Sequence, residues 1–145
     1  MEPLTGALSQ SAASKDSNHL TDLIEEQGRI LEMISAGDSL HHILNAIVRW
    51  AEKESRDGLV ASILLLDQEG KRLLHGAAPS LPEEYNKAIH GIAIGSSVGS
   101  CGTAAFTKQK VIVEDIENDP LWKDYRDLAM KFDLKACWST PLINR

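Results

Sequence analysis

GSSVGSCGTAAFTKQKVIVEDI, residues Gly95 to Ile116, runs from a glycine-rich loop through a helix of small residues into an apolar strand. Glycines before a helix can offer backbone N–H groups to a phosphate, and a cysteine there can be activated by the helix dipole. However, no lysine follows a loop glycine, and neither G-x-x-x-x-G-K-[ST] nor G-x-G-x-x-G occurs. We therefore predict that the glycines form tight turns and that Cys101 packs as a small core residue.

Hydrophobic periodicity predicts two helices ahead of this stretch. Apolar residues recur at three- and four-residue spacing over residues 20–34, and Gly37 stands where a C-terminal cap belongs. Asp38 or Ser39 then caps a second helix, whose apolar residues lie at positions 40, 43, 44, 47, 48 and 51. Residues 1–18 are rich in small polar residues and predict a disordered leader or an interdomain linker.

The segment after the second helix has the pattern of a β-hairpin. LVASILLLD (59–67) and RLLHGAA (72–78) are short apolar runs on either side of a turn that contains Gly70. A short helix follows, in which Ser80 and Glu83 have the spacing of a capping box.

The C-terminal third predicts two strands around one helix. KVIVEDI (110–116) is the first strand, Asp119 and Pro120 begin the helix, and LKACWSTPLI (134–143) is the second strand. The resulting order ααββααβαβ predicts the α+β class rather than a doubly wound sheet.

Composition excludes several classes of protein. The chain has 145 residues, 43% of them hydrophobic, and a net charge of −6, which argues against binding to nucleic acid or to an anionic membrane. No apolar run approaches the roughly 20 residues that cross a bilayer. The two cysteines, Cys101 and Cys137, form neither a disulfide framework nor a C-x-x-C pair, so we expect a reduced, cytoplasmic protein.

Few residues carry an obvious chemical signal. The five histidines are scattered, so no metal site is expected. The carboxylates between Glu114 and Asp127 are best explained by surface solvation and helix capping. Cys137 lies on an apolar strand and is predicted to be a core residue. Trp122, Tyr125 and Trp138 either stack on a flat ligand or pack in the core, and the sequence leaves both possibilities open.

Four spaced motifs resemble the GAF domain. They read G-S-C-G-T-A-A-F, V-I-V-E-D-I, D-P-L-W-K-D-Y-R-D-L-A and A-C-W-S-T-P-L, within residues 99–142. The resemblance extends from about residue 20 to the end of the chain, so we assign residues 19–145 to this domain. Its subtype is the input domain of bacterial sensor histidine kinases and cyclic-di-GMP signalling proteins.

The resemblance implies a fold and a binding site. GAF domains have a six-stranded antiparallel sheet with paired helices on one face and a small-ligand pocket on the other. The family's C-terminal strand and closing helix have no counterpart here, so we expect a domain truncated at its C-terminus. The implied pocket residues are Cys101, Thr103, Phe106, Asp115, Trp122, Tyr125, Trp138 and Thr140.

Departures from the family's specialised members are equally informative. Free methionine-sulfoxide reductases share the stretch that Cys101 to Ala104 matches, but their second cysteine has no equivalent between Pro120 and Leu134. Bilin-binding members carry a cysteine and a histidine where Leu121 to Tyr125 offers neither. No motif indicates haem, and the signature of cyclic-nucleotide members is also absent. We therefore expect no catalytic residues, no metal and no bilin or haem cofactor.

The sequence thus predicts a non-catalytic sensory or regulatory module. It would bind an unknown small molecule and control a histidine kinase or a cyclic-di-GMP enzyme domain elsewhere in the parent protein. A ligand-free dimerisation module is the main alternative, and an enzyme similar to free methionine-sulfoxide reductases is another. We expect a homodimer through the helix Leu20–Ile34, with Gln27 as its single polar interruption. The edge of the last strand is expected to pair with another copy or to be poorly ordered.

Overall fold

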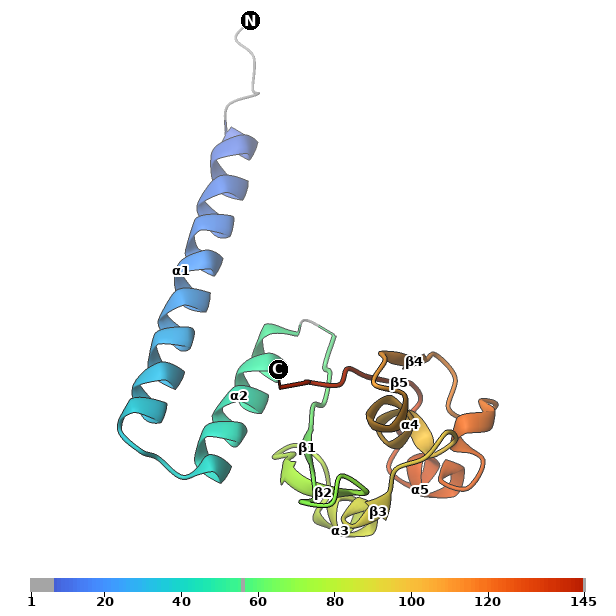
Figure 1. The fold of residues 1–145 in the computed structure, drawn as a ribbon. Coiled ribbons are helices and arrows are strands. Elements are labelled where there is room, and N and C mark those ends of the chain that lie inside the picture. The colour runs from blue at the N-terminus through green and yellow to red at the C-terminus, as the bar shows by residue number, and fades with distance from the viewer. Residues whose placement is uncertain (1–6, 56, 145) are drawn as a thin grey trace, which may run out of the picture.

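The computed structural model describes residues 7–55 and 57–144, with side chains from residue 17 onward. Helices and short antiparallel strands alternate, which confirms the α+β class (Figure 1). The elements in chain order are α1 Ala7–Ser35, α2 Leu40–Glu54, β1 Ile63–Leu66, β2 Arg72–Ala77, α3 Glu83–Ile89, β3 Ile92–Ala93, α4 Gly99–Thr107, β4 Val111–Val113, the 3-10 helix η1 Pro120–Trp122, α5 Arg126–Lys131 and β5 Cys137–Ser139.

The strands form two small antiparallel sheets. One has the order β1-β2-β3 and the other pairs β4 with β5. The predicted hairpin is confirmed, with Leu65 opposite Leu74 and a register irregularity between Ile63 and Leu64. The two-residue strand β3 was not predicted, because so short an element has no recognisable sequence pattern.

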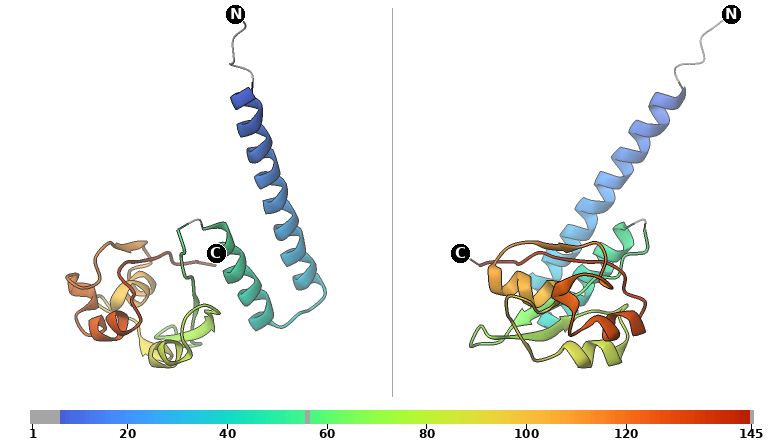
Figure 2. Two further views of the ribbon diagram at one scale, coloured as in Figure 1. Left: turned by 180° about the vertical axis from the view of Figure 1, so that it is seen from behind. Right: turned by 90° about the vertical axis from the view of Figure 1, so that its right-hand side faces the viewer.

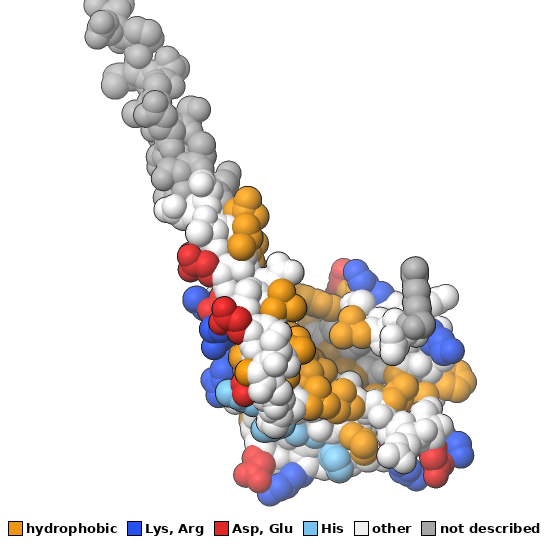
Figure 3. Space-filling view, turned by 60° about the vertical axis from the view of Figure 1, so that its left-hand side comes forward, with side chains coloured by type: hydrophobic (Ala, Val, Ile, Leu, Met, Phe, Trp, Pro, Cys, Tyr) orange, Lys and Arg blue, Asp and Glu red, His pale blue; other side chains and the backbone are white. Residues whose placement is uncertain are grey.

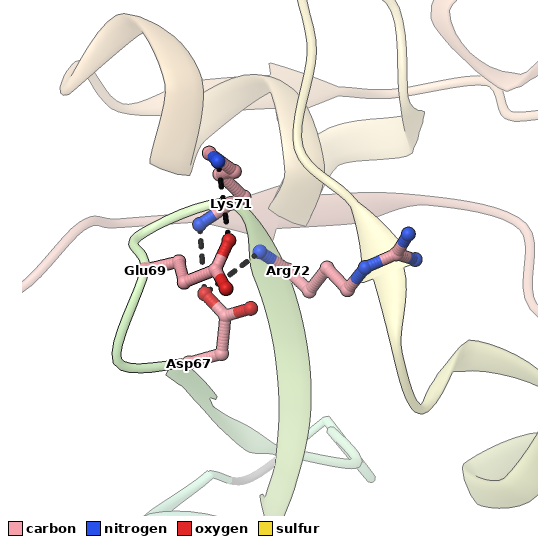
Figure 4. Close-up of polar contacts among 4 residues, drawn as sticks. All are labelled: Asp67, Glu69, Lys71 and Arg72. Atoms are coloured by element: carbon pink, nitrogen blue, oxygen red, sulfur yellow. Dashed lines mark hydrogen bonds and ion pairs between the residues drawn. The ribbon is translucent and has the colours of Figure 1, made fainter.

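The hairpin turn is held by one carboxylate (Figure 4). Asp67 Oδ1 accepts hydrogen bonds from the backbone N–H groups of Lys71, at 2.7 Å, and Arg72, at 3.2 Å. The N–H of Lys71 is the main reason why the pKa of Asp67 is lowered, and Arg72 lowers it further. The neighbouring Lys71 ammonium group pairs with Glu69 at 3.1 Å. The turn that the sequence predicted therefore has a specific hydrogen-bonded structure.

Helix α2 covers one face of the first sheet. A Cβ atom built on Gly76 would lie 3.2 Å from Leu65 Cγ and 3.3 Å from Leu44 Cδ1, so these two residues share the face that α2 covers. Side chains alternate along a strand, and Leu64 and Leu73 accordingly lie on the opposite face. The first sheet thus has α2 on one face, while Leu64 and Leu73 on the other face are not covered by α2.

Helix α1 lies beside α2 near its C-terminal end and projects away from the rest of the molecule toward its N-terminus (Figures 1 and 2). Ile30 is buried in this contact. Gly37, with φ of 76°, ends the helix, and Ser39 is the residue that caps α2, accepting from His42 N at 3.2 Å. These caps were predicted correctly because they depend on residues that are adjacent in sequence.

The N-terminus of α1 corrects one expectation. The helix begins at Ala7, so Ala7–Asn18 is helical where a disordered segment was expected. Once the periodic segment has formed a helix, extending that helix through residues such as alanine costs little, because propagation is easier than nucleation. The rest of the predicted leader, residues 1–6, lies outside the described residues. Its alternative role as an interdomain linker remains a prediction.

Two other local predictions are corrected. The capping box at Ser80 does not form, because the Ser80 hydroxyl donates to Glu52 at 2.6 Å and Pro82 precedes the first turn of α3 without a side-chain cap. Asp119 does cap the next helix, accepting from Leu121 N at 2.8 Å. That helix is not continuous, since η1 ends at Trp122 and α5 begins only at Arg126.

Candidate functional site

An apolar cavity of about 40 Å³ lies on the face of the first sheet that α2 does not cover. Side chains from the first sheet and from four helical segments line its walls. They include Leu64 and Leu73 from the sheet, Tyr85 from α3, Trp122 from η1, Leu128 from α5 and residues 98–102 at the start of α4. A water molecule needs about 10–15 Å³ of such space, so the cavity has room for a few atoms only. Larger ligands require one of these walls to move.

The glycine-rich loop forms one wall because its backbone is tightly constrained. Gly99 has φ of 54°, a conformation that favours glycine, and a Cβ atom built there would lie 3.6 Å from Trp122 Cε2. The N–H of Val98 donates to Thr103 Oγ1 at 3.0 Å. A Cβ atom on Gly102 would lie 2.6 Å from Val98 Cγ1, so only glycine lets the loop and helix approach this closely. The loop is thus a corner that faces a cavity.

Ser100 connects this loop to the second sheet. The indole N–H of Trp122 donates to Ser100 Oγ at 3.0 Å, and the Ser100 hydroxyl lies 3.4 Å from the Cys137 carbonyl oxygen, to which it donates. Ser100 is fully buried and Trp122 is 5% exposed. Buried polar groups of this kind require partners, so the two hydrogen bonds fix the indole in the cavity wall.

The two cysteines meet between α4 and β5. Cys101 Sγ lies 3.0 Å from the Ser139 hydroxyl, and Cys137 Sγ donates to the Trp138 carbonyl oxygen at 3.8 Å. A hydrogen bond from Cys101 lowers the pKa of Cys137 to about 7, against the opposing effect of burial. The same interaction and burial raise the pKa of Cys101. When one of the two thiols loses its proton, the negative charge therefore lies on Cys137.

Tyr85 is a titratable group of the cavity wall whose pKa is shifted. Burial is the main cause of its raised pKa, and negative charge on Cys101 or Cys137 raises it further. Its ring meets the Phe132 ring edge-on, with centroids 5.8 Å apart. Tyr85 therefore remains a neutral phenol at neutral pH.

The predicted pocket residues separate into three groups. Cys101, Trp122 and Tyr125 line the cavity. Thr103 is buried behind the loop, where its hydroxyl holds Val98. The other four do not line the cavity: Asp115 and Thr140 are exposed, and Phe106 and Trp138 are more than half exposed. Asp115 instead accepts from Glu117 N at 3.1 Å and from the Asn118 side chain at 2.7 Å. Their expected role in ligand binding remains untested.

Several wall residues escaped the sequence reasoning. Leu64, Leu73 and Leu128 are ordinary core residues by composition, and no signal separates a cavity wall from a packed interior. Tyr85 could have been identified as a candidate wall residue, because an aromatic hydroxyl in a short amphipathic helix needs a polar or solvated neighbour. The contact of Cys101 with Ser139 was missed because it depends on how β5 packs against α4.

Two further observations concern the described part of the chain. Residues 7–55 and 57–144 contain no group of three or more His, Cys, Asp or Glu side chains placed to hold a metal ion. The helices in these ranges are also too short or too polar to cross a membrane.

Comparison with known proteins links this arrangement to a family. Residues 37–145 match the sequence profile of the GAF domain. The chain is also 46% identical over 123 residues to the methyl sulfide methyltransferase-associated sensor of Methanosarcina acetivorans. That alignment covers 85% of this chain but only 12% of the archaeal protein, so the chain spans about an eighth of the length of this relative.

Proposed function

This chain belongs to the GAF domain family, and from that premise we propose that it is a non-catalytic sensory module whose cavity binds a small apolar molecule. The similarity to a protein named as a sensor supports the sensory role. The observation that carries the binding proposal is the apolar cavity between the first sheet and α4. Its walls come from both sheet and helices, so an occupant would alter how these elements pack.

The signal would leave through the terminal helices. Leu64 and Leu73 face the cavity, while the other side of the same strands packs against α2, which contacts α1. A shift of these strands would change the α1–α2 contact. The effector is a histidine kinase or a cyclic-di-GMP enzyme domain of the parent protein. Two free thiols are typical of a reducing compartment, so we propose a cytoplasmic location.

Ligand-induced stabilisation tests the binding proposal. The name of the archaeal relative associates it with a methyl sulfide methyltransferase, and dimethyl sulfide is small and apolar, so it is the first probe. A ligand at about 100 times its Kd stabilises a protein by about 2.7 kcal/mol. We expect the melting temperature to rise with dimethyl sulfide concentration and to saturate. Absence of a shift with dimethyl sulfide and with a series of small apolar compounds would contradict binding in this cavity.

A pair of variants locates the binding site. Leu128→Phe adds volume to the cavity wall and should abolish the ligand-induced shift. Leu66→Phe is the control, because Leu66 is 49% exposed on β1 and does not line the cavity. A shift that survives in Leu128→Phe would place the ligand elsewhere.

A second role is favoured by α1. Leu20, Ile24, Leu31 and Ile34 are each more than half exposed, while Ile30 faces α2 and is buried. Together with Gln27 the exposed positions alternate in steps of four and three residues, which is the heptad seam of a coiled coil. We propose that this seam pairs with the same seam of a second copy. A ligand-free dimerisation module would keep this seam but show no stabilisation by small molecules.

The lining of the cavity argues against the enzymatic alternative. Free methionine sulfoxide carries an ammonium group and a carboxylate, and burying either group requires a partner of opposite charge. Every side chain along the cavity is uncharged in its ordinary state. We therefore assign no catalytic residue and no bilin, haem or metal cofactor to this domain.

A further inference from the structure

Polar side chains are few in the cavity wall, and most of them already have hydrogen-bond partners. Trp122 donates to Ser100, which in turn donates to a backbone carbonyl oxygen of β5. Cys101 Sγ lies 3.0 Å from a serine hydroxyl of the same strand. The remaining two polar side chains are Tyr85 and Tyr125, and Tyr85 is the more deeply buried, with 7% of its surface exposed. A hydroxyl buried to this extent normally has a partner.

The Tyr85 hydroxyl borders the cavity. In the described part of the chain, the side-chain N and O atoms that are both fully enclosed and unpaired belong to Trp50, His75, Asn86 and Arg126. The Tyr85 hydroxyl is not one of these atoms, and it forms no hydrogen bond with the described residues. It therefore lies next to space that water can enter. Because Tyr85 lines the cavity and is otherwise buried, that space is the cavity.

Contacts on both sides of Tyr85 fix the phenol in place. Its ring meets the Phe132 ring edge-on, with centroids 5.8 Å apart. The adjacent Glu84 pairs with Lys131 of α5, and Asn86 ties α3 to the segment after β2 through two hydrogen bonds of 3.3 Å. The hydroxyl is thus held at the cavity before any molecule enters, so an interaction with it costs little further ordering.

We propose that Tyr85 donates a hydrogen bond to the occupant of the cavity, and that this occupant is a small apolar molecule with one acceptor atom, such as a carbonyl oxygen. The inference rests on the proposed function, because it requires a molecule in the cavity. The leucines of the wall contact the apolar part, and the single donor fixes the orientation, as is usual in small-molecule pockets. Burial raises the pKa of Tyr85, so its hydroxyl keeps the proton that it donates.

Acetone and isobutene test the proposal, because they share a planar shape and differ in a carbonyl oxygen against a methylene group. Water solvates acetone much better, so the quantity compared is the change in each dissociation constant between the unaltered chain and Tyr85→Phe, which lacks only the hydroxyl. We expect the Kd of acetone to rise about 2- to 12-fold, the worth of one hydrogen bond. The Kd of isobutene should stay the same or fall. Equal changes for the two compounds, or no change for either, would overturn the proposal.

Tyr125→Phe is the matched control, because it removes the other phenol hydroxyl of the cavity wall. Tyr125 is less buried than Tyr85, and we expect both dissociation constants to be unchanged in this variant. Weaker acetone binding in Tyr125→Phe alone would assign the donor to Tyr125 and overturn the role of Tyr85. Circular dichroism confirms that both variants are folded.

A measurement on the unaltered chain does not depend on the variants. The chain has two tyrosines, so tyrosine labelled with ¹³C at Cζ gives two NMR signals, and each reports on the hydrogen bonding of its hydroxyl. We expect acetone to move the Tyr85 signal to saturation and isobutene to move it less. Binding of isobutene with no effect of acetone on the Tyr85 signal would overturn this inference and leave the proposed function intact. Absence of binding by both compounds and by dimethyl sulfide would contradict both.

Discussion

Gly76 is the position where a single methyl group should cost most. A Cβ atom there would lie 2.7 Å from the carbonyl oxygen of Ile63 on the paired strand, and the side chains of Leu65 and Leu44 leave no space beside it. Overpacking of this kind costs about 1–3 kcal/mol. We expect Gly76→Ala to lower the free energy of unfolding by that amount in urea denaturation.

Gly28 provides the matched control for Gly76. It lies within α1, and a Cβ atom there would meet nothing within 4 Å. Alanine in a helix is favoured over glycine by about 0.5–1 kcal/mol. Gly28→Ala should therefore stabilise the protein or leave it unchanged, and similar losses in both variants would show that the close contact at Gly76 is not the cause.

Asp67 should make the stability of the hairpin depend on pH. Its pKa in the folded chain is lowered from the usual 3.8, chiefly by the backbone N–H of Lys71. A lowered pKa means that the carboxylate stabilises the fold above pH 3.8, and that this contribution is lost as pH falls through the folded-state pKa. Asp67→Asn should be less stable than the unaltered chain at pH 7, with a smaller difference at pH 3. A difference in urea midpoint that is the same at both pH values would contradict this assignment.

Single residues also show what sequence reasoning can predict. Ser39, Gly37 and Asp119 were assigned correctly, because a cap bonds to residues that are a few positions away. Ser80 was assigned wrongly, since its hydroxyl bonds to Glu52 of another helix. The side chain of such a residue depends on tertiary structure, which local spacing does not contain.

Among the elements, α1 carries the clearest prediction. Its exposed seam includes Leu31, which is 55% exposed. Leu31 occupies an a position of the heptad repeat. A glutamate there would place like charges next to each other at the centre of a parallel pair of helices, and burial of a charge without a partner is costly. We expect Leu31→Glu to shift the chain from dimer to monomer in sedimentation velocity.

Glu32 offers a control on the same helix. It is exposed, adjacent to Leu31 and outside the seam, so Glu32→Lys changes the charge without entering the proposed interface. This variant should sediment like the unaltered chain. A Leu31→Glu chain that sediments unchanged would leave α1 without a role in self-association.

The elements themselves were predictable where their patterns were long or strongly periodic. Helices α1 and α2 and the β1–β2 hairpin were found, although β1 begins only at Ile63 rather than at residue 59. The break between η1 and α5 was missed, because the apolar spacing of Trp122, Tyr125 and Leu128 fits a continuous helix equally well. The break nevertheless leaves all three side chains on the cavity wall.

For the whole molecule, the resemblance predicted the fold class correctly. The α+β class and the position of α2 on one face of the first sheet agree with expectation. Trp138 was expected at the pocket but is 59% exposed on β5, opposite Ile112 of β4. Strand alternation decides which face each residue occupies, and a shift of one position in the assumed register reverses that choice.

The surface as a whole has a second apolar region besides the α1 seam. Ile112 and Trp138 are paired across β4 and β5 and are both more than half exposed, and Leu142 and Ile143 follow with exposed fractions of 88% and 60%. Figure 3 shows hydrophobic side chains gathered along the helices and around the adjoining hollow of the molecule. Within the described residues, β5 has a strand partner on one side only. Exposed apolar edges of this kind promote strand addition between copies.

This region should cause an association that is separate from pairing through α1. We expect the Leu31→Glu chain, although unable to pair through α1, to form larger species as its concentration rises. Adding Leu142→Lys and Ile143→Lys should abolish these species, because lysines on an exposed edge oppose the approach of a second strand. The two exposed side chains contribute little to the fold, so the urea midpoint should change little. Sedimentation velocity over a concentration series measures the effect, and unchanged association in the lysine variant would place the contact on another surface.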